Sequence, residues 1–148
     1  MYGIALGYDF IYDYLTEEQK AYTRKVLYEK GLRHYINSYY GQAVRVDWVT
    51  ATGNWGCVCN GAAIATAISI MDDADEKVLE ACKTVLTNAV QSLEWPLMLT
   101  YPDGAWSEGP AYTDYAMIYL FGGALAPLKY ACGTTYDLLD AKGVSDIL

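Results

Sequence analysis

The sequence predicts an all-α fold built from stacked helical hairpins. Apolar residues recur at helical spacing over most of the 148 residues, and the alternating pattern of a β-strand is almost absent. The predicted helices alternate between nearly uncharged and amphipathic segments, with about 50 residues from one uncharged helix to the next. Such alternation is typical of arrays in which buried inner helices lie between outer helices that have one polar face.

The first two predicted helices span residues 2–15 and 17–40. The first is apolar and rich in tyrosine. Thr16 precedes the second, and Gln19 follows three residues later, which is the pattern of a capping box at a helix N-terminus. The second helix is therefore expected to be amphipathic, and its outer side carries Lys20, Arg24, Lys25, Glu29, Lys30 and Arg33.

Three more helices are predicted at residues 57–71, 76–95 and 111–131. The first of these has no charged residue and the last has few, so both are expected to be buried on all sides. Three aspartates at 72, 73 and 75 precede the helix at 76–95. We interpret them as an N-cap with charge that suits the helix dipole, and not as a metal site. Gly133 is predicted to end the last helix.

The loops before the two later inner helices, residues 41–56 and 101–110, are expected to meet. Inner helices of such an array run parallel, so these loops should lie at the same end and form one cleft. They contain three of the four tryptophans, and the fourth, Trp95, stands just before the second loop.

Residues 101–115 combine acids, aromatic residues and turn residues directly before an apolar helix. Pro-Asp-Gly at 102–104 favours a tight turn, and Pro110 suits the first turn of a helix. Glu108 stands at the entrance of that helix. Three tyrosines would follow on one of its faces: Tyr112, Tyr115 and Tyr119.

Composition limits the possible partners. A net charge of -8 and a pI near 4.4 oppose binding to nucleic acid, which depends on Lys and Arg at phosphates. No apolar run approaches the roughly 18 to 20 residues of a membrane span. The first residues lack the basic segment of a signal peptide, but an excised segment would lack it too, so the location of the protein stays open.

The four cysteines are predicted to be small buried residues, since their spacing fits neither a zinc finger nor a redox pair. They are Cys57, Cys59, Cys82 and Cys132. We expect no metal and no cofactor. Aromatic residues are more informative, because 15 Tyr and 4 Trp supply flat surfaces with polar tips that can pack helices or stack on sugar rings.

Three segments together resemble the heparinase II/III and alginate-lyase-like polysaccharide lyases. They are GYDFIYDYLTEE at 7–18, TGNWGCVCNGA at 52–62 and YPDGAWSEGPAY at 101–112. The resemblance implies an incomplete (α/α) toroid followed by an antiparallel β-sandwich domain. Only later hairpins of the toroid are matched, so residues 1–148 are expected to form a single all-α unit or a segment of a larger protein.

The resemblance also implies a reaction and its residues. Members cleave acidic polysaccharides by β-elimination at a uronic acid, in which a base removes the C5 proton and the bond from C4 to the bridging oxygen breaks. Asn54 would map to the amide that neutralises the uronate carboxylate, and Tyr112 to the acid and base, with Tyr115 as the next candidate. We expect the substrate to contact Trp48, Trp55, Trp106, Glu108 and Asp103. The sequence does not select the polymer or endo against exo cleavage.

Structural roles are the alternative for these same residues. Asn54 would then cap the helix that begins near Trp55, and Glu108 would cap the helix predicted at 111–131. The tryptophans and tyrosines would pack in the core.

The match to the family is incomplete in one respect. Several members have a histidine directly after the asparagine, where this chain has Trp55. Its one histidine, His34, is predicted on an outer helix away from both loops. We therefore expect the segment to be inactive in isolation.

Two other functions stay open. In the first, Asp103, Glu108 and Asp114 supply the carboxylate pair of an (α/α) toroid glycoside hydrolase that acts on uronides. In the second, the chain is a non-catalytic helical scaffold that binds saccharide or a protein partner, and the Tyr112 hydroxyl is buried. An open array also exposes apolar faces at its ends, which predicts self-association.

Overall fold

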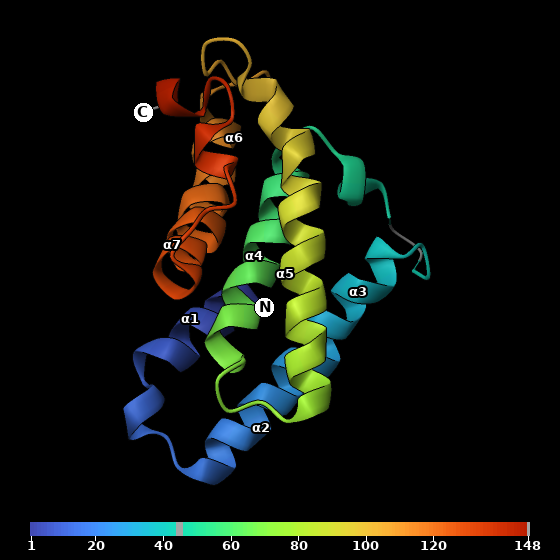
Figure 1. The fold of residues 1–148 in the computed structure, drawn as a ribbon, viewed down its shortest axis with the longest axis vertical. Coiled ribbons are helices and arrows are strands. Elements are labelled where there is room, and N and C mark those ends of the chain that lie inside the picture. Colours follow the sequence, from blue (N-terminus) through green and yellow to red (C-terminus); the bar gives the residue numbers. More distant parts are fainter. Residues whose placement is uncertain (44–45, 148) are drawn as a thin grey trace.

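The computed structural model describes residues 1–43 and 46–147, and within these ranges the chain has helices and no strand. This confirms the all-α prediction. Figure 1 shows the α-helices, which are α1 (Tyr2–Phe10), α2 (Glu17–Leu27), α3 (Arg33–Tyr39), α4 (Asn54–Ile70), α5 (Glu76–Leu97), α6 (Pro110–Met117) and α7 (Ala126–Cys132).

Two π-helical segments join neighbouring α-helices into longer rods. Tyr28–Leu32 connects α2 to α3, and Ile118–Leu125 connects α6 to α7. The rod of α2 and α3 then corresponds to the helix predicted at 17–40, and the rod of α6 and α7 to the helix predicted at 111–131.

Helix α4 occupies the centre of the molecule and packs against α1, α5 and the rod of α6 and α7 (Figure 1). Most of its residues are buried, as predicted from its lack of charge, although Trp55 is exposed and Val58, Cys59 and Ile68 are half-buried. Two glycines allow the closest helix contact, since a Cβ built on Gly123 would lie 2.9 Å from the carbonyl carbon of Gly61.

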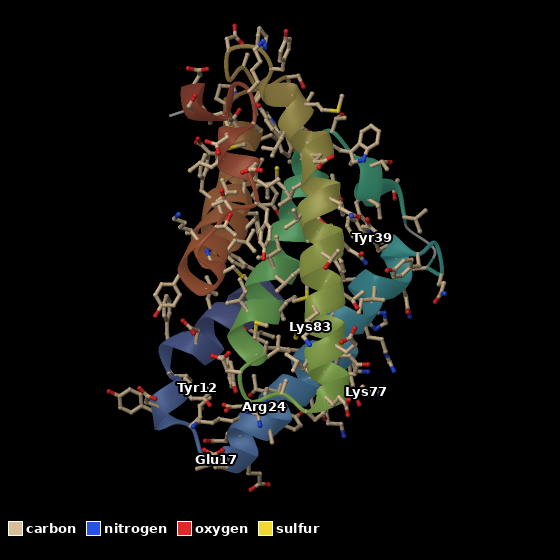
Figure 2. The ribbon with its side chains drawn as sticks, in the orientation of Figure 1. Tyr12, Glu17, Arg24, Tyr39, Lys77 and Lys83 are labelled. Carbon is tan, nitrogen blue, oxygen red and sulfur yellow. The ribbon has the colours of Figure 1, made fainter. Side chains whose placement is uncertain are left out.

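The outer helices bury one face each. Leu27, Leu32 and Tyr35 from the α2–α3 rod belong to the same core as Val85 and Leu93 of α5, while the lysines and glutamates of these helices are mostly exposed. Figure 2 shows Glu17, Arg24 and Lys77 at one end of the molecule. The loop that precedes α6 lies at the opposite end (Figure 1), and the last part of the loop that precedes α4 reaches it there, since Asn54 contacts Glu108.

Local signals for the helix ends are confirmed. Thr16 and Gln19 form both hydrogen bonds of the capping box, at 3.2 and 2.9 Å. The Asp75 side chain caps α5 by accepting a hydrogen bond from the N–H of Val78 at 2.9 Å. Pro110 is the first residue of α6, and Gly133 ends α7 with a φ of 72°.

Two helix boundaries differ from the prediction by three residues or more. The first helix ends at Phe10 and not at residue 15, and a 3₁₀ turn follows at Tyr12–Tyr14. Phe10 and Tyr14 are 77% and 88% exposed, so continuing the helix would bury little apolar surface there. Helix α4 begins at Asn54, three residues before the predicted start at 57, because the N–H of Asn54 has an acceptor in another loop.

The burial of the cysteines was predicted only in part. Cys57 and Cys82 are buried and Cys59 is half-buried, but Cys132 is exposed because it stands in the last turn of α7. All four are free thiols.

Among the described residues, no helix is both long enough and apolar enough to cross a membrane. Large apolar side chains are exposed on α1 and on the rod of α6 and α7, including Phe10, Ile118 and Tyr130. Self-association through these faces stays a prediction.

Candidate functional site

The two loops predicted to meet are joined by the carboxylate of Glu108. Its Oε2 accepts a hydrogen bond from the backbone N–H of Asn54 at 2.6 Å, and its Oε1 accepts one from the Asn54 side-chain amide at 2.8 Å. The indole N–H of Trp106 donates to Oε2 at 3.0 Å. Three donors from two loops therefore converge on one carboxylate.

Glu108 supplies the cap that α4 lacks in its own sequence. The N-cap residue is Gly53, which has no side chain to accept from the first N–H groups of this helix of 17 residues. A carboxylate at this position satisfies an unpaired N–H and faces the positive end of the helix dipole. The expected roles are thus corrected, because Asn54 is the first residue of α4 and not its cap, and Glu108 caps α4 and not α6.

The glycines on either side of Asn54 are required by close packing. A Cβ on Gly53 would lie 2.8 Å from Oε1 of Glu108. A Cβ on Gly56 would lie 2.7 Å from the carbonyl oxygen of Ala51 and 3.0 Å from Pro96 of α5. The Gly-Asn-Trp-Gly order therefore lets the loop, α5 and the Glu108 carboxylate approach the start of α4.

The tryptophans of the two loops have different environments. Trp55 is 58% exposed in the first turn of α4, and Trp106 is half-buried beside Glu108. Trp48 is only 8% exposed, and its ring packs against Tyr35 at 4.9 Å between centroids. Trp48 is thus a core residue, with little surface left to contact a substrate.

The two candidate catalytic tyrosines are accessible on α6. Tyr112 is 54% exposed and Tyr115 is 43% exposed. Tyr115 and Tyr119 form an edge-to-face pair with 5.4 Å between ring centroids. The ring of Tyr119 also packs against that of Tyr2 in α1, with 4.9 Å between centroids. Burial, followed by a hydrogen bond with Tyr115, raises the pKa of Tyr119. Tyr112 stands apart from these aromatic pairs, and its exposure argues against the buried hydroxyl expected of a scaffold.

The remaining acids of the second loop are exposed. The Asp103 carboxylate accepts a hydrogen bond from the N–H of Ala105 at 3.3 Å, which stabilises the turn. Asp114 is exposed on α6. Asp103 therefore stabilises the turn, whereas Glu108 caps the N-terminus of α4.

His34 was expected to lie away from both loops, and this is wrong for the first loop. It lines a cavity of about 230 Å³ together with Trp48 and Cys59. The side chain of Met1 lies across Gly31 at the same cavity. His34 is therefore a neighbour of the first loop. Its neighbour in that loop is Trp48, which belongs to the core.

A buried polar network, which the sequence analysis missed, holds the first loop in place. The Tyr35 hydroxyl donates to the Asn60 side chain at 2.7 Å, and the Asn60 amide donates to Ser92 at 2.8 Å. The Ser92 hydroxyl donates to the carbonyl of Val49 at 2.6 Å. Burial raises the pKa of Tyr35 well above its ordinary value. An asparagine inside an otherwise apolar helix was the available sign of this network.

In comparisons with known proteins, no family model matches the chain and no curated protein matches its sequence. The interpretation of the site therefore depends on its own residues and geometry.

Proposed function

We propose that the chain is a segment of a partial (α/α) toroid from a polysaccharide lyase that cleaves a uronic-acid-containing polysaccharide by β-elimination. The observation that supports this most is the meeting of Asn54, Trp106 and Glu108 from two distant loops, next to the helix that presents Tyr112. A site assembled from two loops at one end of a helical array is suited to an extended polymer.

The reaction requires a group that can take and return a proton. The base removes hydrogen from C5 of the uronate, the electron pair forms the C4–C5 double bond, and the bond from C4 to the bridging oxygen breaks. The departing oxygen then takes up a proton. In its phenolate form a tyrosine could accept the C5 proton and then, as the phenol, donate that proton to the departing oxygen. We assign both steps to Tyr112, which lies in the first turn of α6 with 54% of its surface exposed. Tyr115 is the second candidate.

The carbanion formed at C5 is stabilised when the adjacent carboxylate is neutralised by hydrogen-bond donors. The start of α4 already binds a carboxylate in this structure, that of Glu108, through the backbone and side-chain N–H groups of Asn54. The Asn54 amide carries two hydrogens, of which Glu108 accepts one. Because Glu108 already occupies the positive end of the α4 dipole, the donor offered to a uronate carboxylate is the second amide hydrogen of Asn54.

Aromatic and acidic side chains would complete the contacts with sugar rings. Trp55 is next to Asn54 and 58% exposed, so it presents a flat surface for stacking. The exposed Asp103 offers acceptors for hydroxyl groups. Trp106 contributes by fixing Glu108, and through Glu108 it fixes Asn54.

The hydrolase alternative is weaker at this site. It requires one of the acids to donate a proton to the glycosidic oxygen. The Glu108 carboxylate instead accepts hydrogen bonds from three donors on its two oxygens, so it is engaged in holding the two loops together. Asp103 is also engaged in its own turn.

The test uses the full-length protein, because this segment has Trp55 where several family members have a histidine and is expected to be inactive alone. Unsaturated uronate would be followed by ultraviolet absorbance on heparan sulfate, hyaluronan, chondroitin and alginate. Asn54→Asp places a negative charge against the substrate carboxylate, so it is expected to abolish the product. Product formation at the unchanged rate in Asn54→Asp would remove Asn54 from the mechanism.

A further inference from the structure

A cavity of about 580 Å³ shares the α5–α6 loop with the candidate site but is lined by other residues. One wall comes from the end of α5 and the loop, with Glu94, Met98 and Tyr101. The other wall comes from the segment after α7, with Tyr136, Asp137 and Lys142. The proposed lyase chemistry uses none of these six residues.

Buried contacts hold the two walls in a fixed relation. The hydroxyl of Thr100, which is fully buried, lies within hydrogen-bonding distance of two carbonyl oxygens, that of Leu97 on one wall at 2.7 Å and that of Lys142 on the other at 2.8 Å. Gly143, with a φ of 84°, packs so closely that a Cβ would collide with the carbonyl oxygen of Thr100. Val144 is completely buried beside it. The cavity is therefore formed before any ligand arrives.

The backbone is strained where it lines this cavity. Tyr136 and Asp137 are consecutive residues with φ angles of 52° and 63°. Residues other than glycine seldom adopt this region, and such strain clusters at binding sites where the surrounding structure enforces it. The strained pair places one aromatic and one acidic residue on the same wall.

The lining combines flat apolar surface with hydrogen-bond acceptors. Met98, Tyr101 and Tyr136 are 61%, 59% and 50% exposed, so at least half of the surface of each is open to a ligand. The carboxylates of Glu94 and Asp137 are at the same cavity, and in residues 1–43 and 46–147 neither lies within ion-pairing distance of a basic side chain. Apolar walls with a few polar groups are typical of small-ligand sites.

The charges that line this cavity favour a neutral sugar over a uronate. The cavity is lined by two carboxylates, of Glu94 and Asp137, and by one ammonium group, of Lys142. That ammonium lies 4.2 Å from the centre of the Tyr101 ring, where it forms a cation–π contact. A uronate in the cavity would meet two like charges, whereas a neutral sugar offers hydroxyl donors to both carboxylates and its C–H face to the tyrosines. We propose that this cavity binds a neutral sugar unit of the polysaccharide. The identity of that polymer rests on the proposed function.

The experiment is saturation-transfer NMR on the 148-residue chain with four probes: cellobiose, N,N′-diacetylchitobiose, glucuronate and tetramethylammonium. We expect at least one neutral disaccharide to bind more tightly than glucuronate or tetramethylammonium. Tyr101→Ala should weaken this binding about tenfold, since it removes a stacking surface. Glu94→Gln keeps the size of the side chain and should narrow the preference for the neutral sugar over glucuronate. Tyr14→Ala is the matched control, because Tyr14 is 88% exposed and lines none of this cavity.

Three results would overturn the inference: no binding of either neutral disaccharide, equal binding by wild type and Tyr101→Ala, or preference for glucuronate or tetramethylammonium. Binding is measured without catalysis, so its failure is distinct from failure of the lyase proposal. If the chain binds the disaccharide here but the full-length protein forms no unsaturated uronate, the binding proposal is supported and the lyase proposal is contradicted.

Discussion

Glu108 and Asn54 are 54 residues apart in the chain, and the carboxylate of the first caps the helix that begins at the second. The two hydrogen bonds, at 2.6 and 2.8 Å, make the loop before α6 part of the N-terminus of α4. Any change to Glu108 therefore alters both loops of the candidate site and the stability of the central helix.

Removal of the Glu108 carboxylate should destabilise the chain. Glu108→Ala leaves the Asn54 N–H without its acceptor, and loss of a helix cap costs about 1–2 kcal/mol of unfolding free energy. Urea unfolding followed by circular dichroism would measure this. Glu80→Ala is the control, since Glu80 is on the exposed side of α5 and its contact with Lys83 is long, at 4.0 Å. Equal stability of the two variants would show that Glu108 is not a cap.

The contact between α4 and the Ile118–Leu125 segment should tolerate no side chain at Gly123. In Gly123→Ala the new Cβ would lie 2.9 Å from Gly61, so the helices must separate, at a cost of about 1–3 kcal/mol. Gly7→Ala is the matched control in α1, where a Cβ meets nothing within 4 Å. It should stabilise the helix by up to about 1 kcal/mol. Thermal unfolding of both variants would test this, and destabilisation by both or by neither would contradict the described packing.

The buried tyrosine network should have a measurable energy. Tyr35→Phe leaves the Asn60 side-chain oxygen buried without its 2.7 Å donor, which costs about 1–3 kcal/mol. Tyr22→Phe removes a hydroxyl from a residue that is 69% exposed and should leave stability unchanged. The two variants would be compared by urea unfolding. A Tyr35→Phe protein as stable as wild type would mean that Asn60 finds another donor.

Stability should fall in alkaline solution because of buried thiols. Burial raises the pKa of Cys57 and Cys82 from 9.0 to about 12, with Glu108 adding to the effect on Cys57. The unfolded chain then loses these protons first, so the free energy of unfolding decreases as the pH rises from about 9 toward about 12, by about 1.4 kcal/mol per pH unit for each thiol.

Replacing one thiol shows how much that thiol contributes to the decrease of the unfolding free energy with pH. Cys82→Ala should show a shallower decrease above pH 9 than wild type, whereas Cys132→Ala, at an exposed position, should match wild type more closely. Unfolding free energies at several pH values would be compared. Identical slopes in wild type and Cys82→Ala would rule out the buried thiol as a cause.

Local sequence signals predicted the helices well, because capping and periodicity act within a few residues. Thr16 with Gln19, Asp75 and Pro110 each marked a helix start that the structure has. The start of α4 at Asn54 was missed, since its cap comes from Glu108, and a contact over that separation leaves no pattern in the nearby residues.

The site was predicted in outline and not in its contacts. Parallel inner helices were enough to bring the two loops to one end. The assignment of Trp48 failed because an aromatic residue in a loop has no periodic pattern to reveal burial, and its packing against Tyr35 depends on the fold of α3. The exposure of Trp55 and Tyr112 follows in the same way from how α4 and α6 are rotated, which the sequence does not specify.

The most direct test of the lyase proposal is the ultraviolet absorbance of unsaturated uronate in the full-length protein and its Tyr112→Phe variant, on the four polymers named above. Tyr22→Phe, at another exposed tyrosine, serves as the control. The proposal predicts product from at least one polymer, retained in Tyr22→Phe and lowered by about a hundredfold or more in Tyr112→Phe. The absence of product on every polymer, or an unchanged rate in Tyr112→Phe, would contradict it.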